Sequence, residues 1–136
     1  MKKTLIAFAC TATLLSACGD SANDAAEDRV EDAAEASAAA AGPVEAALGL
    51  TEAQLIDAEL IGADNAELGD VQSVLRAADG TVDRLLVEIE DSDPDRFVEV
   101  PVAGLTPVAR GDDTDLSTTM TAQDLTALPD AVLPAP

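Results

Sequence analysis

Short apolar runs separated by turn residues fill the second half of the chain, and they limit the folds that it can adopt. Each run is between four and nine residues long, which is typical of a β-strand and short for a helix. In one of them Leu85, Val87 and Ile89 occupy alternate positions, as in a strand with one buried face. The runs lie at residues 60–63, 68–76, 82–90, 97–101, 106–110 and 115–120. Six short strands at close spacing predict a small β-barrel or β-sandwich.

A short helix is expected on either side of the strands. Thr51 is followed three places later by Gln54, which is the spacing of a helix-capping box. A closing helix is expected over residues 121–128, because Thr121 can cap it and Pro129 ends it. The sequence therefore predicts a mainly β domain with a short helix before and after its strands.

The expected core contains the large apolar residues of these runs, with two leucines of the closing helix as a plug. They are Leu60, Ile61, Val71, Leu75, Leu85, Val87, Ile89, Val98, Val100, Leu105, Val108 and Leu116, with Leu125 and Leu128 in the helix. No disulfide can reinforce this core, because Cys18 is the only cysteine after residue 17. We therefore expect a small margin of stability.

The N-terminal residues have the layout of an export signal. Lys2 and Lys3 precede an apolar stretch of about a dozen residues, and small residues follow it. The stretch is too short to span a membrane, which takes about 20 residues. Leu15-Ser16-Ala17-Cys18 resembles the lipobox of bacterial lipoproteins, in which cleavage precedes a cysteine that carries acyl chains of the palmitate type.

The lipobox resemblance implies that residues 1–17 are removed and that Cys18 anchors the chain to a bilayer. The alternative is a coincidental cysteine near an ordinary cleavage site, but Leu15 is larger than an ordinary signal peptidase prefers at its position. Cys10 lies inside the apolar stretch and is taken as incidental. Gly19 follows the modified cysteine, and Asp20 comes one place after the position of the known inner-membrane retention signal. We therefore expect the periplasmic face of the outer membrane.

The composition after residue 17 excludes several classes of function. Removal of residues 1–17 takes away two lysines and no acid, so five arginines face 27 acids and the net charge is about −22. Such a chain repels nucleic acid, whose affinity depends on Lys and Arg. It has no histidine and no cysteine besides Cys18, which excludes zinc sites built from Cys and His as well as Ser–His–Asp and Cys–His catalysis. The chain is therefore expected to have no cofactor and not to be an enzyme.

Residues 18–50 are expected to form a disordered acidic linker. Alanine and acids dominate them up to Pro43, and Val30 is the only large apolar side chain in that stretch, so it cannot bury a core of its own. As a flexible coil, residues 19–50 would span roughly 30 Å, and at most about 110 Å when fully extended. The alternative is an acidic helix that docks on a partner.

A series of motifs resembles the PRC-barrel domain. The motifs are Leu60-Ile61-Gly62-Ala63, residues 68–75, Asp79-Gly80-Thr81-Val82, residues 85–89, Val98-Glu99-Val100-Pro101-Val102 with Leu105, and residues 121–125 with Leu128-Pro129. The resemblance covers residues 58–130 and implies a small β-barrel with a structural or adaptor role and no catalytic residues. The chain differs from the family in residues 91–95, where a glycine-rich stretch is expected. The predicted organisation is a signal peptide (1–17), a lipidated cysteine with a linker (18–50), a PRC-type barrel (51–130) and a tail (131–136).

Two groups of aspartates resemble metal-binding loops. Asp91, Asp93 and Asp95 alternate like the first ligands of an EF-hand, but Arg96 and Val102 stand where that loop needs glycine and glutamate. A solvated turn is the favoured interpretation and a weak calcium site the alternative. The same alternatives apply to the second group, which consists of Asp112, Asp113 and Asp115.

Pairs of carboxylates could also indicate glycoside chemistry. The candidate pairs are Glu88 with Glu90, and Asp79 with Asp83. No aromatic platform for a sugar accompanies them, so exposed strand faces explain them better. The functional hypothesis is a lipid-anchored periplasmic protein whose barrel is a non-catalytic interaction or structural module, with another envelope protein as its partner. The alternative is a periplasmic protein that binds divalent cations.

Overall fold

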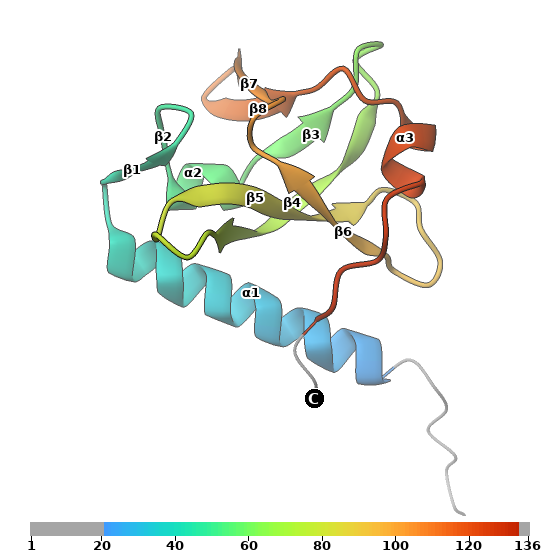
Figure 1. Ribbon diagram of the computed structural model, residues 1–136, viewed down its shortest axis with the longest axis horizontal. Helices are drawn as coiled ribbons and strands as arrows, with labels where there is room; N and C mark the ends of the chain where they lie inside the picture. Colours follow the sequence, from blue (N-terminus) through green and yellow to red (C-terminus); the bar gives the residue numbers. More distant parts are fainter. Residues whose placement is uncertain (1–20, 134–136) are drawn as a thin grey trace, which may run out of the picture.

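The computed structural model describes residues 21–133, with side chains from residue 23 onward. A six-stranded sheet forms its centre, surrounded by helices and a small hairpin (Figure 1). The strands of this sheet are β3 (Glu59–Ile61), β4 (Glu67–Arg76), β5 (Val82–Ile89), β6 (Phe97–Pro101), β7 (Thr106–Arg110) and β8 (Asp113–Ser117). Each of the six expected runs overlaps one strand, and the domain is mainly β, as the sequence predicts.

The order of the strands in the sheet is β6-β5-β4-β3-β8-β7. Strands β3 to β6 form an antiparallel meander, and β8 returns to pair in parallel with β3. The outermost strands are β6 and β7, and no pairing joins them within residues 21–133. The predicted closed barrel is therefore not seen in the described residues, where the sheet is open.

Two short helices begin where the sequence predicts them. Helix α2 (Glu52–Ile56) has the expected capping box, in which Thr51 accepts from the backbone N–H of Gln54 and the Gln54 side chain accepts from that of Thr51. Helix α3 (Ala122–Thr126) has the same arrangement between Thr121 and Asp124. Each box satisfies backbone donors that a helix terminus leaves unpaired.

The main core lies on the face of the sheet that α2 and α3 help to cover. It includes Leu55 and Leu125 of these helices, both fully buried, together with most of the expected core residues. One expectation is wrong, because Val108 is 47 % exposed. Leu128 packs against the main core and Leu75 against a second cluster, but both are only partly buried. Val108 is exposed because β7 is an edge strand, paired only with β8, and most of its side chains reach solvent.

The expectation of a disordered linker is wrong for residues 21–41, which form the longest helix, α1 (Ser21–Ala41). It is also wrong for residues 45–50, which belong to a two-stranded hairpin. The buried side chains of α1 are Ala26, Val30, Ala34 and Ala38, which repeat every four residues and so lie on one face. Figure 1 shows α1 lying along one side of the sheet, away from the β7–β8 hairpin. Because alanine side chains are small, the helix can approach the sheet closely. Three alanines and one valine therefore form a buried stripe along it.

A second, smaller core lies between α1 and the sheet. Val30 packs there with Leu86 of β5 and Phe97 of β6, and both strand residues are buried. The alternation in β5 therefore does not mark a solvent-facing side at Leu86, because α1 covers it. Ala131 and Leu133 also pack against this cluster, so the end of the described chain meets the first helix.

A two-stranded hairpin connects α1 to α2. Its strands are β1 (Glu45–Ala47) and β2 (Leu50–Thr51), which pair antiparallel across a turn at Leu48 and Gly49. Both turn residues have positive φ, 55° and 78°, which glycine adopts more readily than leucine. Leu50 is buried in the main core. Within the described residues, no helix is long and apolar enough to cross a membrane.

Candidate functional site

Cys18, the predicted lipid attachment site, lies outside the described residues. Helix α1 begins at Ser21, so the sequence places only Gly19 and Asp20 between the cysteine and the helix. The candidate sites within the described residues consist of carboxylates, and they gather on β3, β4, β5 and the loop after β5.

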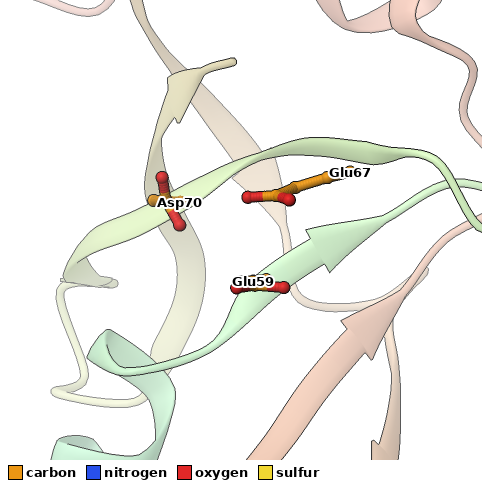
Figure 2. Close-up of side chains that lie close together, drawn as sticks. All are labelled: Glu59, Glu67 and Asp70. Carbon is orange, nitrogen blue, oxygen red and sulfur yellow. The ribbon is translucent and has the colours of Figure 1, made fainter.

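Three carboxylates meet on the β3–β4 hairpin (Figure 2). Antiparallel pairing places Glu59 opposite Asp70 and Ile61 opposite Glu67, with an irregularity in the register after Leu60. As a result, one carboxylate oxygen from each of Glu59, Glu67 and Asp70 lies within 4.8 Å of the other two. We call these three residues the hairpin carboxylates.

The hairpin carboxylates lie close enough together for one divalent cation to bridge them. Ligands on opposite sides of a calcium ion lie about 4.8 Å apart, and those around a magnesium ion about 4 Å apart. Glu59 already has one cation nearby, because Arg110 Nη1 lies 3.5 Å from its Oε2 atom. The charge of Glu59 is the largest influence on Glu67 and raises the pKa of that carboxyl, while Arg110 lowers it. The group therefore carries unbalanced negative charge.

A hollow of about 230 Å³ lies beside this group, and most of its lining residues are acidic. Its carboxylates are Asp70, Glu88, Glu90, Asp91 and Asp95. The structure thus brings Asp91 and Asp95 of the first predicted calcium loop to one hollow, whereas Asp93 is exposed and does not line it. The loop itself is held by Ser92, whose Oγ donates to the carbonyl of Ile89 and accepts from the backbone N–H of Arg96.

Glu88 is the half-buried member of this hollow. Burial raises the pKa of Glu88 to about 7, and the nearby charges of Glu27, Asp95 and Asp70 contribute in the same direction. Gln72 opposes the shift by donating a 2.8 Å hydrogen bond to Glu88 Oε2. The carboxyl of Glu88 therefore changes charge near neutral pH, which none of the sequence patterns had indicated.

The second predicted calcium group is divided in the structure. Asp112 and Asp113 border a small hollow of about 70 Å³ with Asp57. Asp115 is buried instead, and its Oδ2 atom lies 2.6 Å from Arg110 Nε. An ion pair therefore already neutralises the aspartate that would have been the third ligand.

The carboxylate pairs considered for glycoside chemistry have other contacts. Asp79 accepts hydrogen bonds from the backbone and the hydroxyl of Thr81, which lower its pKa. Asp83 lies 3.5 Å from Arg84. Of the other pair, both Glu88 and Glu90 line the acidic hollow. Asp79 therefore serves a turn, and Asp83 forms an exposed ion pair.

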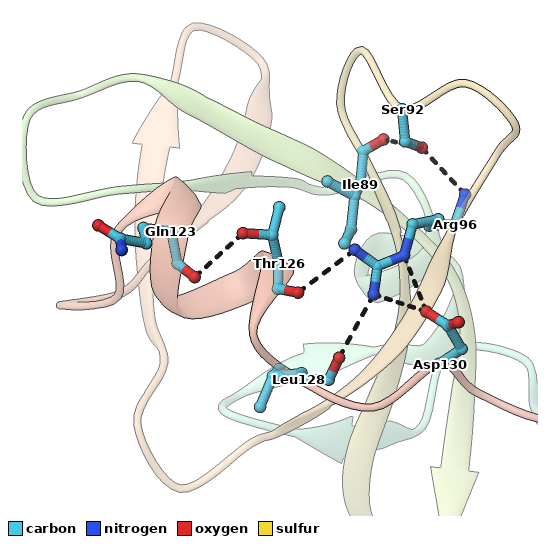
Figure 3. Close-up of polar contacts among 7 residues, drawn as sticks. All are labelled: Ile89, Ser92, Arg96, Gln123, Thr126, Leu128 and Asp130. Atoms are coloured by element: carbon cyan, nitrogen blue, oxygen red, sulfur yellow. Dashed lines mark hydrogen bonds and ion pairs between the residues drawn. The ribbon is translucent and has the colours of Figure 1, made fainter.

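Arg96 joins the closing helix and the C-terminal segment to the sheet (Figure 3). Its Nη2 atom lies 2.6 Å from Asp130 Oδ1, and Nε donates to the same oxygen at 2.8 Å. The guanidinium also donates to the carbonyls of Thr126 and Leu128. Next to it, the backbone N–H of Ala131 donates to the carbonyl of Phe97. These contacts explain Arg96 as a structural residue, and nothing in its spacing had indicated this.

The sequence matches no protein-family model and no curated protein. The resemblance of residues 58–130 to the PRC-barrel domain therefore stays a prediction that its ordered motifs support.

Proposed function

We propose that this chain is a lipoprotein of the bacterial cell envelope, anchored through acylated Cys18. The anchor holds it at the periplasmic face of a membrane, and the outer membrane is the favoured one. The domain of the chain is a β-sheet domain of the PRC-barrel type, with an open sheet in the described residues, and it acts as a non-catalytic module for binding or supporting another envelope protein. The observation that carries the proposal is the lipobox-like Leu15-Ser16-Ala17-Cys18 at the end of a short apolar stretch.

The position of α1 limits how far the domain can lie from the lipid anchor. With Cys18 three residues before Ser21, the lipid attachment point is at most about 10 Å along the chain from the helix. Because α1 packs on the sheet through Val30, the domain lies close to the bilayer when α1 is docked. This replaces the long flexible spacer that the linker had been expected to provide.

The proposal of a PRC-type domain is supported by the ordered motifs of residues 58–130. The described residues form a mainly β domain with short helices, which is the coarser expectation that these motifs carry. Absence of a catalytic role is supported by composition, since the chain after residue 17 offers only carboxylates, hydroxyls and arginines as reactive side chains.

The test is site-specific photo-cross-linking in the cell that produces the protein. Reagents that join lysines are unsuitable, because no lysine follows residue 17. A photoreactive residue at Val44 or Val108, both exposed apolar positions, is expected to capture one reproducible envelope protein. The control places it at Asp79 in an exposed turn. Capture of no protein at either apolar position in several growth states, or equal capture at Asp79, contradicts the proposal.

The hairpin carboxylates favour a second candidate, a periplasmic protein that binds divalent cations. Their oxygens lie close enough together for one divalent cation to bridge them, and the acidic hollow continues the negative surface. Calcium titration followed by backbone amide chemical shifts is expected to move the β3 and β4 signals saturably, and Glu67→Gln should abolish this. Asp83→Asn, on the exposed side of β5, is the matched control. No shift at millimolar calcium excludes the candidate.

A further inference from the structure

Helix α1 is attached to the domain by a narrow apolar contact. Its buried side chains are three alanines and Val30. Val30 is the only large apolar side chain that the helix contributes to the second core. At its C-terminal end, Gly42 has a φ of 62° and is followed by Pro43, so the backbone turns sharply there. A helix of 21 residues is thus held along its length by little more than a stripe of small residues.

Acidic groups face one another across this contact. A hollow of about 210 Å³ separates α1 from α2 and β4. Glu31 and Glu35 border it from α1, and Asp57 and Asp70 border it from the domain. Carboxylates on the two sides of this hollow repel each other. Salt screens the repulsion because these groups reach solvent.

The same opposition occurs one turn earlier on α1. Glu27 precedes Val30 by three residues and lies on the same side of the helix, while Glu88 follows Leu86 by two residues and lies on the same face of β5. Val30 and Leu86 belong to one buried cluster, and the charge of Glu27 contributes to the raised pKa of Glu88, so Glu27 lies near Glu88. Burial raises the pKa of Glu27, and the charge of Asp95 raises it further. Arg29, the one basic residue of α1, is exposed.

We propose that α1 is a releasable arm, which opposed carboxylates push away from the domain and which screening of their charge lets dock. Docking buries Leu86 and Phe97 under Val30, and release uncovers them without unfolding the sheet. The sheet does not depend on the arm for its pairing, because the strand order β6-β5-β4-β3-β8-β7 includes no residue of α1.

Release would change the position of the domain relative to the membrane, a consequence that rests on the proposed anchor at Cys18. A detached helix of 21 residues adds about 32 Å to the reach of the domain. The docked arm holds the domain at the bilayer, and the released arm lets it reach outward with its apolar patch uncovered.

The test is amide hydrogen exchange, read by mass spectrometry on the full chain carrying Cys18→Ser, with a chelator present. Because this variant cannot be acylated, the result is independent of the anchor. At neutral pH, residues 21–41 are expected to exchange about tenfold faster in 10 mM salt than in 300 mM salt. The β4 and β5 amides should change much less. Glu31→Gln and Glu27→Gln should each slow exchange of the arm in low salt.

Asp32→Asn is the matched control, because it also removes one charge from α1. Asp32 is exposed and borders neither hollow. This substitution should leave exchange of the arm nearly unchanged. The proposal is overturned if the arm and the sheet exchange together at both salt concentrations, or if Asp32→Asn slows the arm as much as Glu31→Gln does.

Discussion

The two buried carboxylates in the described part of the chain each depend on an arginine that reaches solvent. Glu52 is 1 % exposed, and its Oε2 atom lies 2.5 Å from Nη2 of Arg76, whose side chain is 41 % exposed. Asp115 is paired with Arg110 in the same manner. A buried carboxylate left without its cation is costly, whereas an arginine left without its carboxylate can still be hydrated. The two partners of such a pair therefore contribute unequally.

Arg76→Ala is expected to lower the free energy of unfolding by about 3 kcal/mol, because it leaves Glu52 buried and unpaired. Glu52→Gln should cost only about 1 kcal/mol, since the guanidinium that remains is hydrated and still donates to the carbonyl of Gly80. Urea denaturation followed by circular dichroism measures both. Arg84→Ala, whose partners Glu99 and Asp83 are exposed, is the control and should cost less than about 0.5 kcal/mol. Equal losses for all three variants contradict this account.

Gly69 is required by the close approach of β4 to β5. A Cβ atom at this position would lie 2.0 Å from the backbone oxygen of Glu88, and a backbone atom of a paired strand cannot move aside. Gly69→Ala should therefore destabilise the domain by about 3 kcal/mol or more, measured by thermal unfolding. Gly104→Ala meets no atom within 4 Å and should change stability by less than about 0.5 kcal/mol. A Gly69→Ala variant as stable as Gly104→Ala would show that the strands are not paired in this register.

At the scale of elements, α1 decides whether the apolar patch on β5 and β6 is covered. Its stripe has only one large side chain, so the helix is sensitive to a single substitution. Val30 is buried against Leu86 and Phe97, and Ala33 lies on the exposed side of the same helix.

Val30→Asp is expected to detach α1, because it replaces the main apolar contact with a buried, unpaired charge. Amide exchange should then lose protection in residues 21–41 while β4 and β5 keep theirs. Ala33→Asp adds the same charge on the exposed side and should leave protection unchanged. If Val30→Asp leaves residues 21–41 protected, α1 is held by contacts other than this stripe.

The elements divide into those that local chemistry determines and those that depend on tertiary contacts. The six strands and the two capped helices could be predicted, since alternation, turn residues and capping boxes are local signals. An acidic helix in place of α1 was only the alternative to a linker, and its docking on the sheet of the same chain could not be predicted. The buried stripe of Val30 and small alanines depends on tertiary contacts such as those with Leu86 and Phe97. The hairpin carboxylates were missed for a similar reason: Glu59 and Glu67 become neighbours only through the register of β3 and β4.

The whole molecule is shaped by its acidity. About 22 uncompensated negative charges remain after residue 17, and the acidic hollow concentrates some of them. Such self-repulsion opposes the compact state. A group with a raised folded-state pKa stabilises the protein only while it is protonated, so stability should fall as pH rises.

Glu88 gives this pH dependence a definite range. Its pKa is about 7 in the folded chain against an ordinary value of 4.5, so folding stability should decline between pH 4.5 and about pH 7. The full shift corresponds to about 3 kcal/mol, which solvent screening of this half-buried group reduces to about 2 kcal/mol. Below about pH 3.8 stability should fall again, because Asp79 and Asp124 have lowered pKa values through hydrogen bonds to Thr81 and Thr121.

Urea unfolding at a series of pH values measures this profile. A maximum near pH 4.5 is expected, and Glu88→Gln should flatten the decline above it. Glu45→Gln, at an exposed position of β1, should keep the decline of the parent. A profile that rises from pH 5 to pH 8 contradicts the assignment of Glu88.

The central claim for the whole molecule is that lipid on Cys18 holds a domain whose first helix begins three residues later. Intact-mass analysis of the protein from the membrane fraction tests it most directly, with Cys18→Ser and Cys10→Ser as a matched pair. We expect the parent and Cys10→Ser to lack residues 1–17 and to carry the added mass of acyl chains on Cys18, and Cys18→Ser to carry no acyl mass. A parent chain that keeps residues 1–17, or that is cut without acyl mass on Cys18, contradicts the account.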